Sequence, residues 1–358
     1  MKEIRVLVVD DSPYNRQTII KMLQHTASIK VVGIASDGKE AISKVIKLRP
    51  DVLTLDLEMP TMDGFTFLRW IMKEAPVPII IVSARSDDRS VFKALELGAV
   101  DFIVKPTAKA SPELMRIRDE LIAKVSAVAH LEMAKMKANL ELLTDTTDRK
   151  MEDVAEGLIK IEQPKRVELI AIGASTGGPP AIQAILLRLP SNLPAGVIIS
   201  QHMPEGFTKH FAERLDKISP LPVKEAEDGE VLESGRVLIA PGGYHMTLEQ
   251  KVKEVRTALK RRNLSDKYVP SVDIMMQSAA EVYGRKVLGV ILTGMGKDGK
   301  DGMKTIKAHR GQTIVESEET SVVFGMPQEV IEAGVADKIL PLKEIPEEII
   351  KRCMIDEG

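Results

Sequence analysis

The sequence predicts an α/β protein with two doubly wound parallel-sheet domains. In both halves of the chain short aliphatic segments alternate with amphipathic ones, and the strand-like segments carry Val and Ile on both faces. Such strands are typical of a parallel sheet that helices cover on each side. The length of 358 residues fits about two domains of this kind. We therefore expect domains over residues 1–124 and 166–356, joined by a partly helical linker over 125–165.

The first domain is predicted to be five-stranded. Its strands are residues 5–9, 30–35, 52–57, 79–83 and 102–105. Strands that alternate with helices in this way predict the sheet order 2-1-3-4-5, in which strands one and three are neighbours. After the last strand, Ser111 and Pro112 predict the N-cap and first residue of a helix. The linker that follows has an irregular stretch at residues 144–148.

The second domain repeats the alternation and is expected to be larger. Its predicted strands are residues 167–172, 196–200, 237–240, 287–292, 313–315 and 338–340. Around residues 242–248 the pattern indicates an antiparallel hairpin inserted into this parallel domain.

Composition narrows the choice of partners and compartment. The net charge is −2, from 50 Lys and Arg against 52 Asp and Glu, which favours neither nucleic acid nor an anionic membrane as partner. The chain enters a strand pattern at once and has no apolar run near the ~20 residues of a membrane span, so we expect no signal peptide and no membrane insertion. The single cysteine, Cys353, fits a reducing cytoplasm.

Charged side chains gather at the ends of the first domain's strands. Asp10 and Asp11 end the first strand and Asp56 ends the third, so three carboxylates converge at one edge of the sheet. Oxygen clusters of this kind suit Mg²⁺. Ser83 and Lys105 end the fourth and fifth strands. A hydroxyl and an ammonium beside a metal-bound carboxylate make a site for a phosphoryl group.

These residues lie in stretches that resemble a response-regulator receiver domain. Residues 8–12 read Val-Val-Asp-Asp-Ser, residues 56–60 read Asp-Leu-Glu-Met-Pro, and residues 98–106 read Gly-Ala-Val-Asp-Phe-Ile-Val-Lys-Pro. The resemblance covers the whole first domain. It implies that Asp56 accepts a phosphoryl group from a histidine kinase.

The same resemblance implies a set of metal ligands. Asp11, Asp56 and the backbone carbonyl of Glu58 would bind Mg²⁺ directly, and Asp10 would act through water. It also implies a signalling pair, with Ser83 and an aromatic residue that move on phosphorylation. Here the aromatic residue is Phe102, where many receivers carry Tyr, and Lys105 would hold the phosphate.

A glycine turn in the second domain carries a candidate nucleophile. Residues 173–177 read Gly-Ala-Ser-Thr-Gly between an apolar strand and a helical segment, a setting that projects Ser175 from the end of a sheet. The helix start behind it offers unpaired N–H groups to a carbonyl substrate. The alternative is a turn that only packs or binds phosphate.

Two further residues complete a candidate triad. Among the 6 histidines, His202 follows the strand at 196–200 and so shares the sheet edge with Ser175, whereas His309 is typical of a helix end. Asp298 lies among three glycines after the strand at 287–292 and can orient the imidazole. The order Ser, His, Asp differs from the Ser, Asp, His order of α/β-hydrolases.

The second domain resembles the protein-glutamate methylesterase of bacterial chemotaxis. The matching stretches are residues 172–178, 201–207, 226–230, 239–246, 270–273, 289–299 and 323–327. The resemblance implies hydrolysis of glutamyl methyl esters on methylated chemoreceptor cytoplasmic domains, deamidation of certain receptor glutamines, and no cofactor in this half. The oxyanion would be held by backbone N–H groups of Met295 and of His202 or Thr176. Lys297 departs from the pattern, where a small polar residue is frequent.

The two resemblances together imply control of one domain by the other. Unphosphorylated, the receiver should pack over the strand ends that carry Ser175, and phosphorylation should loosen that packing. Two alternatives remain: a receiver-controlled protein-binding module with a non-catalytic output domain, and a DNA-binding regulator. The second requires a basic helix-turn-helix output, which the sequence does not contain.

Overall fold

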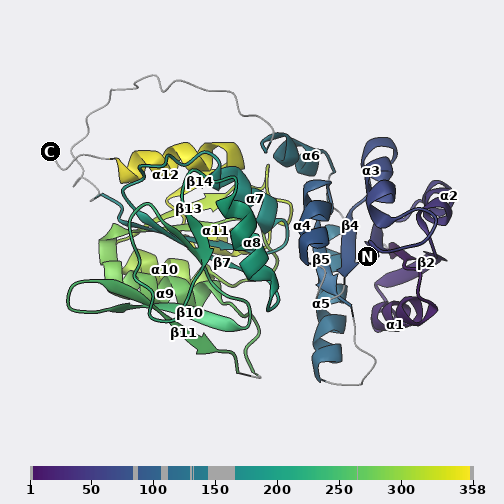
Figure 1. Ribbon diagram of the computed structural model, residues 1–358, viewed down its shortest axis with the longest axis horizontal. Coiled ribbons are helices and arrows are strands. Elements are labelled where there is room, and N and C mark those ends of the chain that lie inside the picture. Colours follow the sequence, from purple (N-terminus) through teal and green to yellow (C-terminus); the bar gives the residue numbers. More distant parts are fainter. Residues whose placement is uncertain are drawn as a thin grey trace.

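The computed structural model describes residues 3–83, 88–105, 112–129, 131, 133–143, 166–263 and 265–354. Two parallel-sheet domains lie side by side, the first in purple to blue and the second in teal to yellow (Figure 1). The predicted fold class is confirmed. Among the described residues, no helix is both long and apolar enough to cross a bilayer.

The first domain has the predicted sheet order, β2-β1-β3-β4-β5, with all pairs parallel. Its strands are β1 (Ile4–Val9), β2 (Ile29–Ala35), β3 (Val52–Leu55), β4 (Ile79–Ser83) and β5 (Asp101–Val104). Its helices are α1 (Pro13–Leu23), α2 (Gly38–Leu48), α3 (Gly64–Glu74), α4 (Asp88–Glu96) and α5 (Pro112–Val128). The side chains of Ser12, Asp37 and Asp63 cap the first three helices, because each accepts the N–H three residues on.

The second domain is built on a seven-stranded parallel sheet in the order β14-β13-β12-β6-β7-β9-β8. Its strands are β6 (Leu169–Ala174), β7 (Gly196–Gln201), β8 (Val223–Glu225), β9 (Val237–Ile239), β12 (Val287–Ile291), β13 (Gln312–Glu316) and β14 (Lys338–Leu340). Its helices are α7 (Gly178–Leu186), α8 (Phe207–Asp216), α9 (Val272–Tyr283), α10 (Lys300–Ala308), α11 (Met326–Glu332) and α12 (Ile345–Cys353). The edge strand β8, of 3 residues, was not predicted from the sequence.

An antiparallel hairpin is present, but residues 242–248 form only its beginning: it consists of β10 (Tyr244–Gln250) and β11 (Val255–Arg261). Its strands pair with each other as a separate two-stranded sheet, and α9 packs against β10.

Most of the described part of the linker is helical. Helix α5 runs past residue 124 to Val128, and α6 (Met133–Glu141) follows. Helix α6 contacts α7, so it lies against the second domain. The predicted cap at Ser111 and the stretch at 144–148 lie outside the described residues.

Candidate active site

Ser175 and His202 leave neighbouring strands at the same edge of the larger sheet. Strands β6 and β7 are parallel, with Ala174 in register with Gln201. Ser175 and His202 are the next residues of the chain after each strand, so both lie at this edge. The Oγ of Ser175 lies 3.1 Å from Nδ1 of His202. This is hydrogen-bond distance, as a nucleophile and its base require.

Asp298 completes the predicted triad. Its Oδ2 lies 2.8 Å from Nε2 of His202. The carboxylate therefore holds the ring proton on Nε2 and leaves the Nδ1 lone pair directed at Ser175. His309 lies elsewhere, exposed at the end of α10, with Nδ1 against its own helix at the Thr305 carbonyl.

The Asp298 carboxylate is buried but strongly hydrogen-bonded. The hydroxyl of Ser271 and the backbone N–H groups of Val272 and Asp273 all donate to it, at 2.7–3.0 Å. Burial alone raises the pKa of Asp298, but His202 and these donors outweigh it and leave the pKa lowered. Asp298 is therefore the ionised partner that a protonated His202 needs.

A second carboxylate stands directly behind Asp298. Asp273 accepts hydrogen bonds from the N–H groups of Gly299 and Gly302, which joins the start of α9 to the start of α10. Burial, together with the nearby Asp298 charge, raises the pKa of Asp273 to about 6. This residue fixes the loop that presents Asp298.

Gln201 is a site residue that the sequence reasoning missed. Its Nε2 donates to the carbonyls of Ser175 (2.9 Å) and His202 (3.1 Å), and so it ties the two turns together. Gly178 leaves room for it, because a Cβ there would lie 2.1 Å from Gln201 Oε1. The available signal was a polar residue that ends an otherwise apolar strand.

The predicted oxyanion residues lie beside Ser175. The N–H of His202 donates to the Ala174 carbonyl, so of the two residues expected to accompany Met295 the structure favours Thr176. Thr293 links the parts of this site: its carbonyl accepts from the N–H of Ser175 and its hydroxyl donates to the carbonyl of Thr176.

Thr293 is in turn held by a buried acid that the sequence reasoning missed. Its N–H donates to Glu316 on β13 at 2.7 Å, and the hydroxyl of Thr320 donates to the other carboxylate oxygen. Complete burial raises the pKa of Glu316 to about 7.

The structure also brings together the carboxylates expected in the receiver site. Asp10, Asp11 and Asp56 each place a carboxylate oxygen within 4.8 Å of the others. Burial raises the pKa of Asp10, and it raises that of Asp56 to about 6, against the lowering effect of Lys105. Asp10 Oδ2 is buried without a hydrogen-bond partner among the described residues. Buried carboxylates with an unused oxygen fit a divalent cation.

The remaining receiver residues surround this cluster. Lys105 Nζ lies 2.6 Å from Asp56 Oδ2, and the N–H of Glu58 lies 3.3 Å from Asp56 Oδ1. Ser83 is buried at the end of β4. Phe102 is buried in β5, and its ring packs against Phe207 of the second domain, with centroids 4.8 Å apart.

The first domain covers the edge that carries Ser175. Strand β5 contributes Asp101, whose Oδ2 accepts a hydrogen bond of 2.5 Å from the Thr176 hydroxyl. Both residues are buried. Met295 packs in one apolar cluster with residues of α5 such as Leu121 and Val125. The receiver therefore touches Thr176 directly, and Met295 packs against the apolar cluster in which the two domains meet.

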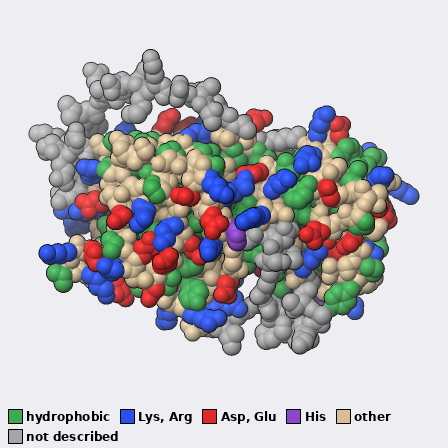
Figure 2. Space-filling view, in the orientation of Figure 1, with side chains coloured by type: hydrophobic (Ala, Val, Ile, Leu, Met, Phe, Trp, Pro, Cys, Tyr) green, Lys and Arg blue, Asp and Glu red, His purple; other side chains and the backbone are tan. Residues whose placement is uncertain are grey.

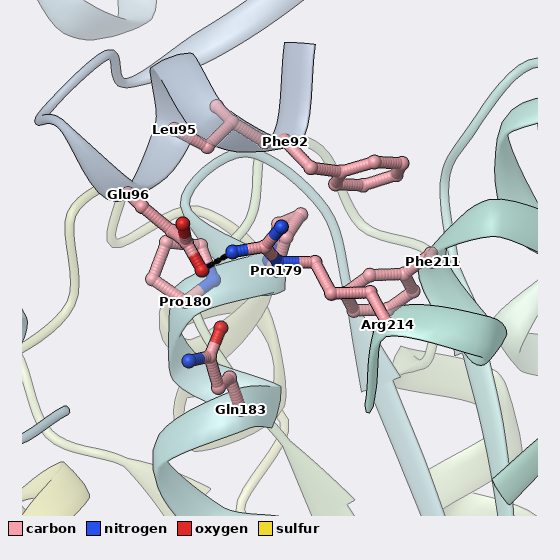
Figure 3. Close-up of a pocket in the computed structure, with 8 residues that line it drawn as sticks. All are labelled: Phe92, Leu95, Glu96, Pro179, Pro180, Gln183, Phe211 and Arg214. Atoms are coloured by element: carbon pink, nitrogen blue, oxygen red, sulfur yellow. Dashed lines mark ion pairs between the residues drawn. The ribbon is translucent and has the colours of Figure 1, made fainter. Parts of the chain in front are cut away.

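Helix α4 extends the interface along α7 and α8 (Figure 1). Phe92 of α4 stacks on Phe211 of α8, with centroids 5.5 Å apart. Beside them Glu96 pairs with Arg214 across the domain boundary, above Pro180 at the start of α7 (Figure 3).

Comparison with known proteins agrees with this architecture. A family model described as CheB methylesterase matches residues 170–349, and one described as response regulator receiver domain matches residues 6–116. The chain belongs to the CheB methylesterase family. The predicted family and the predicted receiver are thus both confirmed.

Relatives of this CheB-family chain match it over its full length. A protein of Geobacter sulfurreducens named protein-glutamate methylesterase/protein-glutamine glutaminase 3 is 50% identical over 99% of this chain and 98% of its own. One of Pyrococcus abyssi with the corresponding name is 42% identical, over 100% and 95%. The crystal structure of the Thermotoga maritima CheB methylesterase catalytic domain is 47% identical, with a TM-score of 0.51 over 52% of this chain and 99% of that chain. These names confirm the expected hydrolase class and do not favour a non-catalytic output domain.

Proposed function

We propose that this CheB-family chain hydrolyses glutamyl methyl esters on the cytoplasmic domains of methylated chemoreceptors, and deamidates receptor glutamines at the same site. The observation that carries the proposal is the continuous hydrogen-bonded chain from Ser175 Oγ through His202 to Asp298, with links of 3.1 and 2.8 Å. The proposed domain limits remain 1–124, 125–165 and 166–356.

The geometry assigns each residue a step. Ser175 Oγ attacks the ester carbonyl while His202 Nδ1 takes its proton, and Asp298 stabilises the resulting imidazolium. The N–H groups of Met295 and Thr176 hold the developing oxyanion; losing one such donor usually costs about 10²–10³ in rate. His202 then protonates the leaving methanol and activates the water that frees the acyl-enzyme. A glutamine substrate releases ammonia by the same steps.

The first domain supplies the control. Asp56 accepts a phosphoryl group from a chemotaxis histidine kinase, and the Lys105 ammonium, which now pairs with Asp56, turns to the phosphoryl oxygens. Asp10, Asp11, Asp56 and the Glu58 carbonyl would hold Mg²⁺, which when bound neutralises charge on the carboxylates and the phosphoryl group.

The position of the aromatic switch residue, Phe102, suggests how phosphorylation would loosen the receiver from the second domain. When Ser83 and Phe102 move toward phosphorylated Asp56, Phe102 leaves Phe207, and the contact that covers Ser175 weakens.

The proposed setting is the cytoplasm, with protein partners only. Cys353 is a buried free thiol, as suits a reducing compartment. On the face that Figure 2 shows, Lys and Arg are interspersed with Asp and Glu, and no extended basic surface marks a nucleic-acid site. We propose no insertion into the membrane and no cofactor in the second domain.

Ser175→Ala tests the proposal. In the presence of a phosphodonor, wild-type protein should release methanol from methylated receptor membranes and Ser175→Ala should release none, because the variant lacks the hydroxyl that His202 activates. Phosphorylation of Asp56 in the variant should match the wild type and serves as the folding control. Activity within a few-fold of wild type would overturn the assignment of the nucleophile.

A further inference from the structure

Tyr268 lies flat against the imidazole of the triad. Its ring is stacked on that of His202, with centroids 4.7 Å apart and planes only 6° from parallel. The same ring lines an open groove of about 380 Å³, together with Gly296 and Gln328. Tyr268 is therefore both a wall of a surface groove and a direct neighbour of the general base.

Tyr268 also touches the loop that carries Asp298. A Cβ built on Gly296 would lie 2.4 Å from the Tyr268 hydroxyl, so only glycine allows this approach. Gly296 has φ of +94°, a backbone conformation that also favours glycine. The contact therefore holds the ring between His202 and the Asp298 loop.

The residues that follow Tyr268 hold the third member of the triad. The Ser271 hydroxyl and the Val272 and Asp273 N–H groups all donate to the Asp298 carboxylate. One short segment, residues 268–273, thus contacts both the base and the acid that orients it. The proposed mechanism depends on the Asp298 carboxylate that these groups hold, but it includes no step for Tyr268.

We propose that Tyr268 is a positioning residue that holds the plane of the His202 ring; the inference rests on the proposed function. The hydrogen bond to Asp298 fixes one ring nitrogen but leaves the ring able to rotate about that link. A parallel aromatic face removes this freedom and keeps Nδ1 directed at Ser175. The electron-rich face also stabilises the imidazolium that forms during attack.

The arrangement makes the aromatic ring, and not the hydroxyl, the active feature. Tyr268→Phe keeps the stacked aromatic face, whereas Tyr268→Leu keeps the apolar bulk but loses the aromatic face. The ammonium of Lys267 lies 4.9 Å from the same ring centroid, which also identifies this ring as a surface that attracts cations.

The test measures the reactivity of Ser175 toward a small sulfonyl fluoride, in the full-length chain activated with a phosphodonor. This reagent does not fill the groove, so a role of Tyr268 as a mere groove wall would not alter its rate. Tyr268→Leu should slow the reaction about 10-fold, and Tyr268→Phe should stay within about twofold of wild type. Gln328→Ala, which removes an exposed side chain from the same groove, should react at the wild-type rate.

Any other result would refute either the positioning role of Tyr268 or the proposed function. Tyr268→Leu at the wild-type rate, or Tyr268→Phe as slow as Tyr268→Leu, would refute the positioning role. Methanol release by the wild-type chain is measured in parallel, and its absence would refute the proposed function and, with it, this inference. Should Tyr268→Leu not fold, proton NMR of the wild type decides: stacking requires a ring-current shift of the His202 ring protons, identified by their loss in His202→Asn, and unshifted protons refute it.

Discussion

Removing one carboxylate from the receiver should switch on the other domain without phosphorylation. The carboxylate is that of Asp101, which accepts a 2.5 Å hydrogen bond from the hydroxyl of Thr176, next to the nucleophile. A hydrogen bond to a charged group contributes about 1.5–3 kcal/mol. This bond exists only while the receiver covers Ser175. Asp101→Ala should therefore shift the equilibrium toward the uncovered state by about 10- to 150-fold. Basal activity should rise by up to that factor.

The assay is methanol release by the full-length chain without a phosphodonor. Lys124→Met is the matched control, because Lys124 pairs with the same carboxylate at 3.1 Å but does not touch Thr176. It weakens the packing of α5 against β5 and keeps the bond between the domains. An Asp101→Ala protein that is no faster than wild type, or no faster than Lys124→Met, would refute the reasoning.

Two further outcomes are expected. His202→Ala should abolish methanol release and His309→Ala should leave it unchanged; loss in the second variant alone would overturn the triad. Burial raises the pKa of Glu316 from 4.5 to about 7, so its contribution to stability is complete below pH 4.5 and is lost as the pH rises through 7. Between pH 4.5 and 8, the free energy of unfolding measured in urea should therefore fall by about 3 kcal/mol more for the wild type than for Glu316→Gln. Parallel pH profiles of the two proteins would contradict this.

The sequence predicted the two sites because parallel strands end at a common edge. Asp10 and Asp56 end neighbouring strands, as do Ser175 and His202, so the order of strands was enough to bring each pair together. Glycines around Asp298 indicated a loop that turns its carboxylate inward. These inferences needed local pattern and topology alone.

Contacts that depend on packing between distant segments were not predictable in this way. The hydrogen bond from Thr176 to Asp101 depends on how the surfaces of the two domains fit together. The local pattern of apolar and polar residues does not specify that fit. Tyr268 reaches His202 only because the chain folds back before α9. Strand β8 is too short to show a period of its own.

The central claim is that phosphorylation of the receiver releases an esterase built on Ser175. The most direct measurement is the initial rate of methanol release from methylated receptor membranes, taken with one preparation of the full-length chain before and after a phosphodonor and Mg²⁺ are added. A coupling of ordinary size, about 1–3 kcal/mol, predicts a rise of roughly 5- to 150-fold. Equal rates before and after, with Asp56 shown to be phosphorylated, would contradict the account.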